Sequence, residues 1–112
     1  AGLRWDMEPI HYLGAGWGGR VPCIPYLPFG SKELAQAGVQ AMGQEYQACL
    51  LGGHGLLAAR RDLEQAYSAA QQTEFLAQIY YYARLAGGGV TLTQAELQDA
   101  KERFRTYRSG AD

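Results

Sequence analysis

The 112-residue sequence predicts one α/β domain whose small sheet is incomplete by itself. Two short apolar runs, residues 47–51 and 56–59, flank the sequence GGHG at 52–55, and they predict two buried strands with a glycine-rich connection. A long run over 63–85 carries apolar residues at helical spacing on more than one side, so we expect it to be covered on more than one side. Two strands leave long unpaired edges, and we therefore expect strands outside this sequence to complete the sheet.

The N-terminal third predicts irregular elements. Residues 8–15 are expected to form a short helical turn, with Pro9 near its first position and the glycine-rich run 14–19 at its end. Residues 21–28 contain three prolines, each of which lacks a backbone N–H. They predict an extended segment at the edge of a sheet and exclude a central strand.

Three helices are expected after this segment. The first covers 32–42, with Ser31 as its N-cap and Gly43 at its end. The second covers 63–85, where Asp62 is the N-cap and Gln65 takes the capping-box position. The glycines at 87–89 end it. A full capping box, Thr93-Gln-Ala-Glu96, opens the last helix over 94–107.

Composition excludes several classes of function. The 47% of hydrophobic residues excludes a disordered chain. Lys and Arg number 10 against 11 Asp and Glu, which argues against nucleic-acid binding by bulk charge and against a polybasic membrane patch. The longest apolar runs fall well short of the roughly 18 residues that a membrane span needs. Two cysteines are too few for a disulfide scaffold, so we expect a reduced, cytoplasmic protein.

His54 is the most informative candidate for chemistry. It lies in the glycine turn between the two predicted strands, where its small neighbours leave room for a ligand. Two interpretations remain open from the residues alone, a loop histidine and a metal ligand. A complete zinc site made of His54 with His11, Cys23 and Cys49 is disfavoured, because no pair has the short spacing of structural zinc sites.

Other motifs have simpler interpretations. His11 and Tyr12 are expected to form a core-facing aromatic pair. The run 14–19 follows no predicted strand and lacks the Gly-Lys-Ser/Thr ending of a phosphate loop. The three tyrosines at 80–82 are expected to pack on several faces of a buried helix, since base stacking would need interleaved basic residues.

Six short motifs, in this order, resemble the second half of the class II aldolase/adducin family. They are EPIHY at 8–12, VPCIPY at 21–26, FGSKEL at 29–34, LLGGHGL at 50–56, DLEQA at 62–66 and RFRTY at 103–107. Each motif is weak alone, but their order is specific, and the likeness covers about residues 8–108. The resemblance implies a three-layer fold with a central, mostly antiparallel sheet flanked by helices. Residues 1–112 would then be the C-terminal portion of that domain.

The resemblance also implies an activity and a set of site residues. Family enzymes use zinc to cleave a ketose 1-phosphate, such as fuculose 1-phosphate, into dihydroxyacetone phosphate and an aldehyde. His54 matches the third zinc ligand, whereas a His-X-His pair and a proton-transferring glutamate belong to the family's first half. Tyr12 matches a tyrosine that acts as an acid in the site of a neighbouring subunit, and Tyr107 matches one that closes over the site. Phe29 and Phe104 match aromatic positions that wall the aldehyde end.

Two departures from the family pattern affect the expectations. Gly53 stands where many members have Asn or His before the third ligand, which changes the local hydrogen bonding but keeps the ligand. The sequence contains no His-X-His pair, so we expect these residues alone to be inactive and to hold less than one zinc per chain. We also expect a homo-oligomer, since family members are typically tetramers. The alternative is a non-catalytic, adducin-like binding or assembly module.

Overall fold

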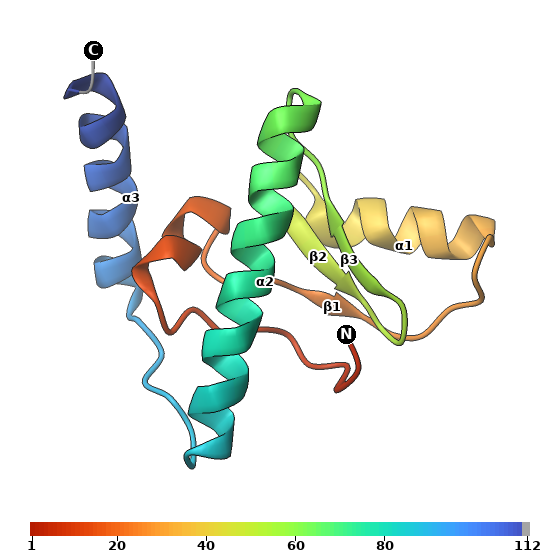
Figure 1. Cartoon of the computed structure of the whole chain (residues 1–112). Coiled ribbons are helices and arrows are strands. Elements are labelled where there is room, and N and C mark those ends of the chain that lie inside the picture. The colour runs from red at the N-terminus through yellow and green to blue at the C-terminus, as the bar shows by residue number, and fades with distance from the viewer. Residues whose placement is uncertain (111–112) are drawn as a thin grey trace.

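The computed structural model describes residues 1–110 and places them in three layers around a small sheet (Figure 1). Helix α1 (Lys32–Met42) packs on strands β1 and β2, and helix α2 (Leu63–Leu85) packs on β2 and β3. The two helices cover opposite faces of the sheet, as expected for a three-layer α/β fold.

The sheet has the strand order β1-β2-β3 within the described residues. Strand β1 (Cys23–Ile24) pairs in parallel with β2 (Ala48–Leu51), and β3 (Gly55–Ala58) pairs antiparallel with β2. The prediction of an edge strand in the proline-rich segment is confirmed. The prediction of two buried strands holds for β2 but is wrong for β3, which is only partly buried because no described strand pairs with its far edge.

Side-chain caps fix where the three α-helices begin. Ser31 Oγ accepts a hydrogen bond from the Leu34 N–H at 3.1 Å. Asp62 Oδ1 accepts one from the Gln65 N–H at 2.8 Å. Thr93 and Glu96 form the reciprocal capping box, with bonds of 2.8 and 3.2 Å. The expected second half of the Asp62 box is not found, because the buried Gln65 Oε1 atom has no hydrogen-bond partner among the described residues.

The first helical element differs from its prediction. A 3₁₀ helix, η1, covers Tyr12–Trp17 and ends at Gly18, whose φ is 90°. The expected start near Pro9 is wrong, because His11 has an extended backbone and its Nδ1 accepts the Leu13 N–H at 3.3 Å, which makes His11 the N-cap. The last helix, α3 (Gln94–Gly110), continues three residues beyond the predicted end and packs chiefly on η1.

The hydrophobic core lies between the sheet and α2. Its buried members come from the N-terminal segment, β2 and one side of α2: Met7, Val21, Ala48, Leu50, Ala69 and Leu76. Of the second apolar side of α2, Leu76 is buried and Tyr80 packs against the core, whereas Phe75 and the later residues Tyr81, Tyr82 and Leu85 are exposed. Residues 1–110 therefore cover only part of the apolar surface of α2. None of the described helices is both long and apolar enough to cross a membrane.

Candidate functional site

The turn between β2 and β3 presents His54 at one end of the sheet. Gly52 donates its N–H to the Ile24 carbonyl at 3.0 Å, and the His54 N–H bonds the Leu51 carbonyl at 2.8 Å. A Cβ at Gly52 would lie 2.5 Å from the Ile24 oxygen, so only glycine allows this approach. Gly53 has a φ of 76°, a conformation that favours glycine. The sequence GGH therefore brings the turn directly against the end of β1.

The His54 imidazole is exposed but held in a defined orientation. Its Nε2 lies 2.7 Å from the Leu27 carbonyl oxygen. A carbonyl only accepts, so Nε2 is the donor in this contact. The Tyr26 ring stacks on the imidazole, with centroids 5.2 Å apart and an interplanar angle of 13°. An exposed imidazole in a glycine-rich turn fits the chemistry of a metal ligand.

His54 fits zinc as one ligand and not as a complete site. Within residues 1–110, no three His, Cys, Asp or Glu side chains form a group that could hold a metal ion. Burial raises the pKa of both the Cys23 and the Cys49 thiols, which favours their protonated forms over the thiolates that bind zinc. This supports the expectation that these cysteines behave as small hydrophobic residues. A catalytic zinc site uses three protein ligands, so a site that includes His54 would need two more from outside the described residues.

A second candidate region lies between η1 and α3. Tyr12, Phe104 and Tyr107 line a groove of about 930 Å³. The Tyr12 and Phe104 rings stack with centroids 5.8 Å apart and an interplanar angle of 20°. The expectation that Tyr12 faces the core is wrong, because it is 57% exposed on this groove, whereas its neighbour His11 is half-buried against Phe75. The groove therefore offers phenol and phenyl groups to solvent.

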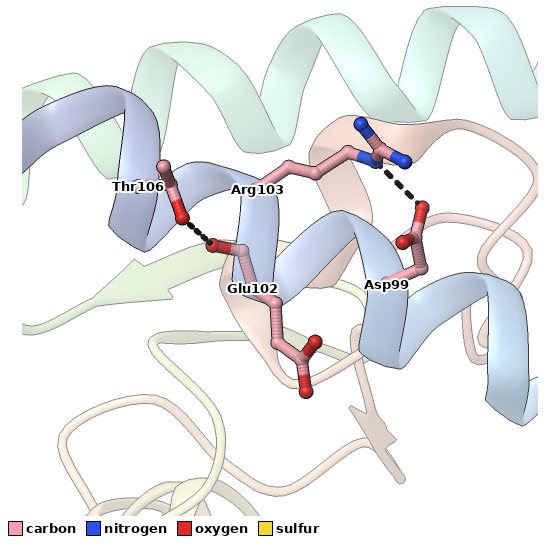
Figure 2. Close-up of polar contacts among 4 residues, drawn as sticks. All are labelled: Asp99, Glu102, Arg103 and Thr106. Atoms are coloured by element: carbon pink, nitrogen blue, oxygen red, sulfur yellow. Dashed lines mark hydrogen bonds and ion pairs between the residues drawn. The ribbon is translucent and has the colours of Figure 1, made fainter. Parts of the chain in front are cut away.

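Charged residues of α3 on the same groove are tied to each other. Arg103 Nε binds Asp99 Oδ2 at 2.8 Å across one helical turn, and the Thr106 hydroxyl donates to the Glu102 carbonyl at 3.2 Å (Figure 2). The hydrogen bond to Asp99 raises the pKa of Arg103. Asp99 and Arg103 were not predicted as groove residues. Their i, i+4 spacing is the sequence signal that could have indicated an ion pair on one face of the helix. Their pairing leaves the aromatic rings as the distinctive chemical groups of the groove.

The five predicted site residues fall in three places. Tyr12, Phe104 and Tyr107 come together in the groove, but His54 is not among the residues that line it. Phe29 lies in the loop before α1 and is 84% exposed. In Figure 1, η1 and α3 lie on one side of α2 and the β2–β3 turn lies on the other. Two other expectations also need correction: Tyr81 and Tyr82 are exposed, and part of the 14–19 glycine run lies inside η1.

Known proteins with similar sequences are sugar-phosphate aldolases. The chain is 36% identical over 107 residues to a 5-deoxy-D-ribulose 1-phosphate aldolase of Bacillus thuringiensis serovar kurstaki. This match covers 96% of this chain and 50% of the relative. It is 38% identical to the L-fuculose phosphate aldolase of Escherichia coli K12, over 94% of this chain and 49% of the relative. The chain therefore spans about half the length of the curated relatives that it matches.

The fold gives the same classification. A solved L-fuculose 1-phosphate aldolase superposes with a TM-score of 0.86 and 34% sequence identity, covering 92% of this chain and 48% of that one. The three layers are thus those of an aldolase-type α/β domain. Residues 2–81 match the family described as Class II Aldolase and Adducin N-terminal domain. The chain belongs to the class II aldolase and adducin family, as its six motifs indicated.

Proposed function

We propose that residues 1–112 are the C-terminal portion of a zinc-dependent aldolase that cleaves a ketose 1-phosphate into dihydroxyacetone phosphate and an aldehyde. Fuculose 1-phosphate and 5-deoxyribulose 1-phosphate are the first substrates to test, because the relatives are named for such sugars. This portion supplies part of the site, and alone it is inactive. The two free thiols support a reducing, cytoplasmic location.

In this proposal the two regions have different tasks. His54 is one of three zinc ligands, and zinc supplies the Lewis acidity that stabilises negative charge on the ketose oxygens. In the cleavage direction Tyr12 takes the proton from the hydroxyl whose oxygen becomes that of the aldehyde, and in the reverse addition it returns this proton to the aldehyde oxygen. Tyr107 covers the site, while Phe29 and Phe104 exclude water from the aldehyde end.

The separation of His54 from Tyr12 is the observation that carries this proposal. Tyr12 lines the η1–α3 groove, and the β2–β3 turn, which contains His54, lies on the other side of α2 (Figure 1). The two residues of one copy therefore belong to separate regions of the described structure. A site shared between neighbouring subunits uses both residues as they are placed, with Tyr12 of one subunit acting beside His54 of another.

Exposed surface supports an assembly of several copies. Phe75, Tyr81, Tyr82 and Leu85 are each at least 47% exposed along α2, and the outer edge of β3 has no paired strand in residues 1–110. Apolar patches and open strand edges of this kind are normally covered. We expect light scattering to report a mass above that of one chain. A monodisperse particle of 12.3 kDa would contradict this expectation.

Activity and metal content test the proposed aldolase. The protein is isolated from its source, its intact mass is measured, and retro-aldol cleavage of both ketose 1-phosphates is followed through the dihydroxyacetone phosphate released. A sample verified as residues 1–112 is assayed in parallel. We expect cleavage and bound zinc in a natural protein of the relatives' length, and neither turnover nor stoichiometric zinc in the 112-residue sample.

Each other outcome rejects part of the proposal. Turnover with one zinc per chain in the verified 112-residue sample would show that these residues form a complete site. A natural protein that contains the other ligands, yet binds no zinc and cleaves neither sugar, would favour the adducin-like assembly module.

A further inference from the structure

A cavity separate from the β2–β3 turn is lined by residues of η1, α2 and α3. Its volume is about 780 Å³, within the range of small-molecule sites. The segment before β2 and the loop before α2 complete its walls, so five parts of the chain meet around it. His54 is not among its lining residues. The cavity is therefore distinct from the proposed zinc ligand.

Positive charge dominates the ionisable groups of this cavity. Arg60, Lys101 and Arg105 supply cationic side chains, and Glu45 supplies the single carboxylate among the lining residues. The whole chain has a formal net charge of −1, so the excess of positive charge is local. A concave site lined by one sign of charge focuses its electric field and attracts ions of the opposite sign. The cavity therefore favours an anion.

The charges of Arg60 and Lys101 are not compensated within the described residues. The ion pairs found there are those of Arg20 and Arg103, and neither of these arginines lines the cavity. Like charges that share a cavity repel each other, and an anion placed between them converts this repulsion into attraction. The planar fork of arginine and the point charge of lysine both suit the oxygens of a phosphate group.

A smaller hollow of about 250 Å³ adjoins the cavity. Gln47, Arg60 and Gln72 line both spaces, and Arg61 adds a further cation to the smaller one. Gln65 also lines the hollow, and its buried Oε1 atom has no hydrogen-bond partner among the described residues. A buried acceptor without a donor is costly, and a ligand hydroxyl group would satisfy it.

We propose that the cavity binds a small phosphate monoester, with the phosphate group between Arg60 and Lys101 and a hydroxyl group directed to Gln65. A phosphate monoester carries about −1.5 to −2 charges at pH 7, which matches a site with several cations and one carboxylate. The site does not depend on the proposed aldolase activity, because it shares no residue with the His54 turn.

Binding at this site would also restrain α3. Phe104 and Tyr107 line both the cavity and the η1–α3 groove, so the two spaces share one wall. A phosphate group held by Arg60 and Lys101 would connect the loop before α2 with α3. We therefore expect bound phosphate monoester to slow amide hydrogen exchange in α3 more than in α1.

Titration of the natural protein at constant ionic strength tests the site. The probes are glycerol 3-phosphate, inorganic phosphate and acetate, and the signal is the Nε–H resonance of Arg60 in arginine-labelled protein, identified by its loss in Arg60→Gln. We expect both phosphates to shift this resonance saturably, with the lower dissociation constant for glycerol 3-phosphate, and acetate to leave it unchanged.

Three results of the titration would overturn the proposal. An Arg60 resonance that no probe shifts would show that the cavity binds no anion in the natural protein. Equal shifts with acetate would show that it does not select phosphate. Tighter binding of inorganic phosphate than of glycerol 3-phosphate would show that the ligand is not an ester.

A pair of lysine variants separates a built site from general charge attraction. Lys101→Gln should raise the dissociation constant of glycerol 3-phosphate by about 10- to 100-fold, the effect of losing a charge-assisted hydrogen bond. Lys32→Gln is the matched control, because Lys32 is the other lysine of the chain, is likewise exposed and lines neither space. Equal dissociation constants for the two variants would contradict the site.

Discussion

The two regions that carry the proposed site residues are held together by different forces. The β2–β3 turn is fixed by backbone hydrogen bonds and by glycines that allow contact at 2.5 Å. The η1–α3 groove is held by side chains, chiefly the stack of Tyr12 on Phe104 and a helix that packs on η1. Backbone hydrogen bonds and close contacts restrain the turn that carries His54, whereas α3 is held on η1 by contacts nearer the surface. A restrained turn suits the metal binding proposed for His54, and a less restrained helix suits the covering of the substrate proposed for the groove.

The largest expected effect separates metal binding from proton transfer. In the proposed zinc enzyme, His54→Ala removes one of three ligands, so zinc and activity should be lost together. Tyr12→Phe removes only the group that exchanges a proton with the aldehyde oxygen, and it should keep zinc while turnover falls by about 10²- to 10⁴-fold. Metal analysis beside steady-state kinetics measures both. A zinc-replete, active His54→Ala enzyme would show that another histidine is the ligand, with His11 the next candidate.

The rigidity of the turn is tested by adding one methyl group. Gly52→Ala places a Cβ against the Ile24 carbonyl, and we expect the free energy of unfolding to fall by about 1–3 kcal/mol. Gly55→Ala is the control, because its Cβ meets nothing within 4 Å, and it should be close to neutral. Urea unfolding measures the difference. Equal stabilities for the two variants would contradict the close approach of the turn to β1.

The smallest expected effect concerns the groove. Phe104→Leu removes the stack on Tyr12, which should cost about 0.5–1.5 kcal/mol and speed amide hydrogen exchange in α3 more than in α2. Tyr107→Leu is the matched control on the same helix, because Tyr107 is 80% exposed. Faster exchange in both variants to the same degree would show that the stack does not hold α3 in place.

Local signals in the sequence determined the helices and their ends. Ser31, Asp62 and Thr93 each supply an oxygen that a helix N-terminus needs, and these starts were confirmed because capping is decided within four residues. Prolines placed the segment at 21–28 at the edge of the sheet for an equally local reason. The order of six motifs also indicated the family, and with it the candidate ligand His54.

Only the tertiary structure decided which residues meet. The stack of Tyr12 on Phe104 joins residues far apart in the chain, and no periodicity predicts it. The expected core position of Tyr12 was wrong because hydrophobicity indicates that an aromatic ring packs, without indicating what it packs against. The contact of Leu27 with His54 likewise depends on the turn folding back onto β1, which two glycines permit but do not specify. Sequence patterns thus determined the elements, while long-range packing determined the geometry in which His54 is presented.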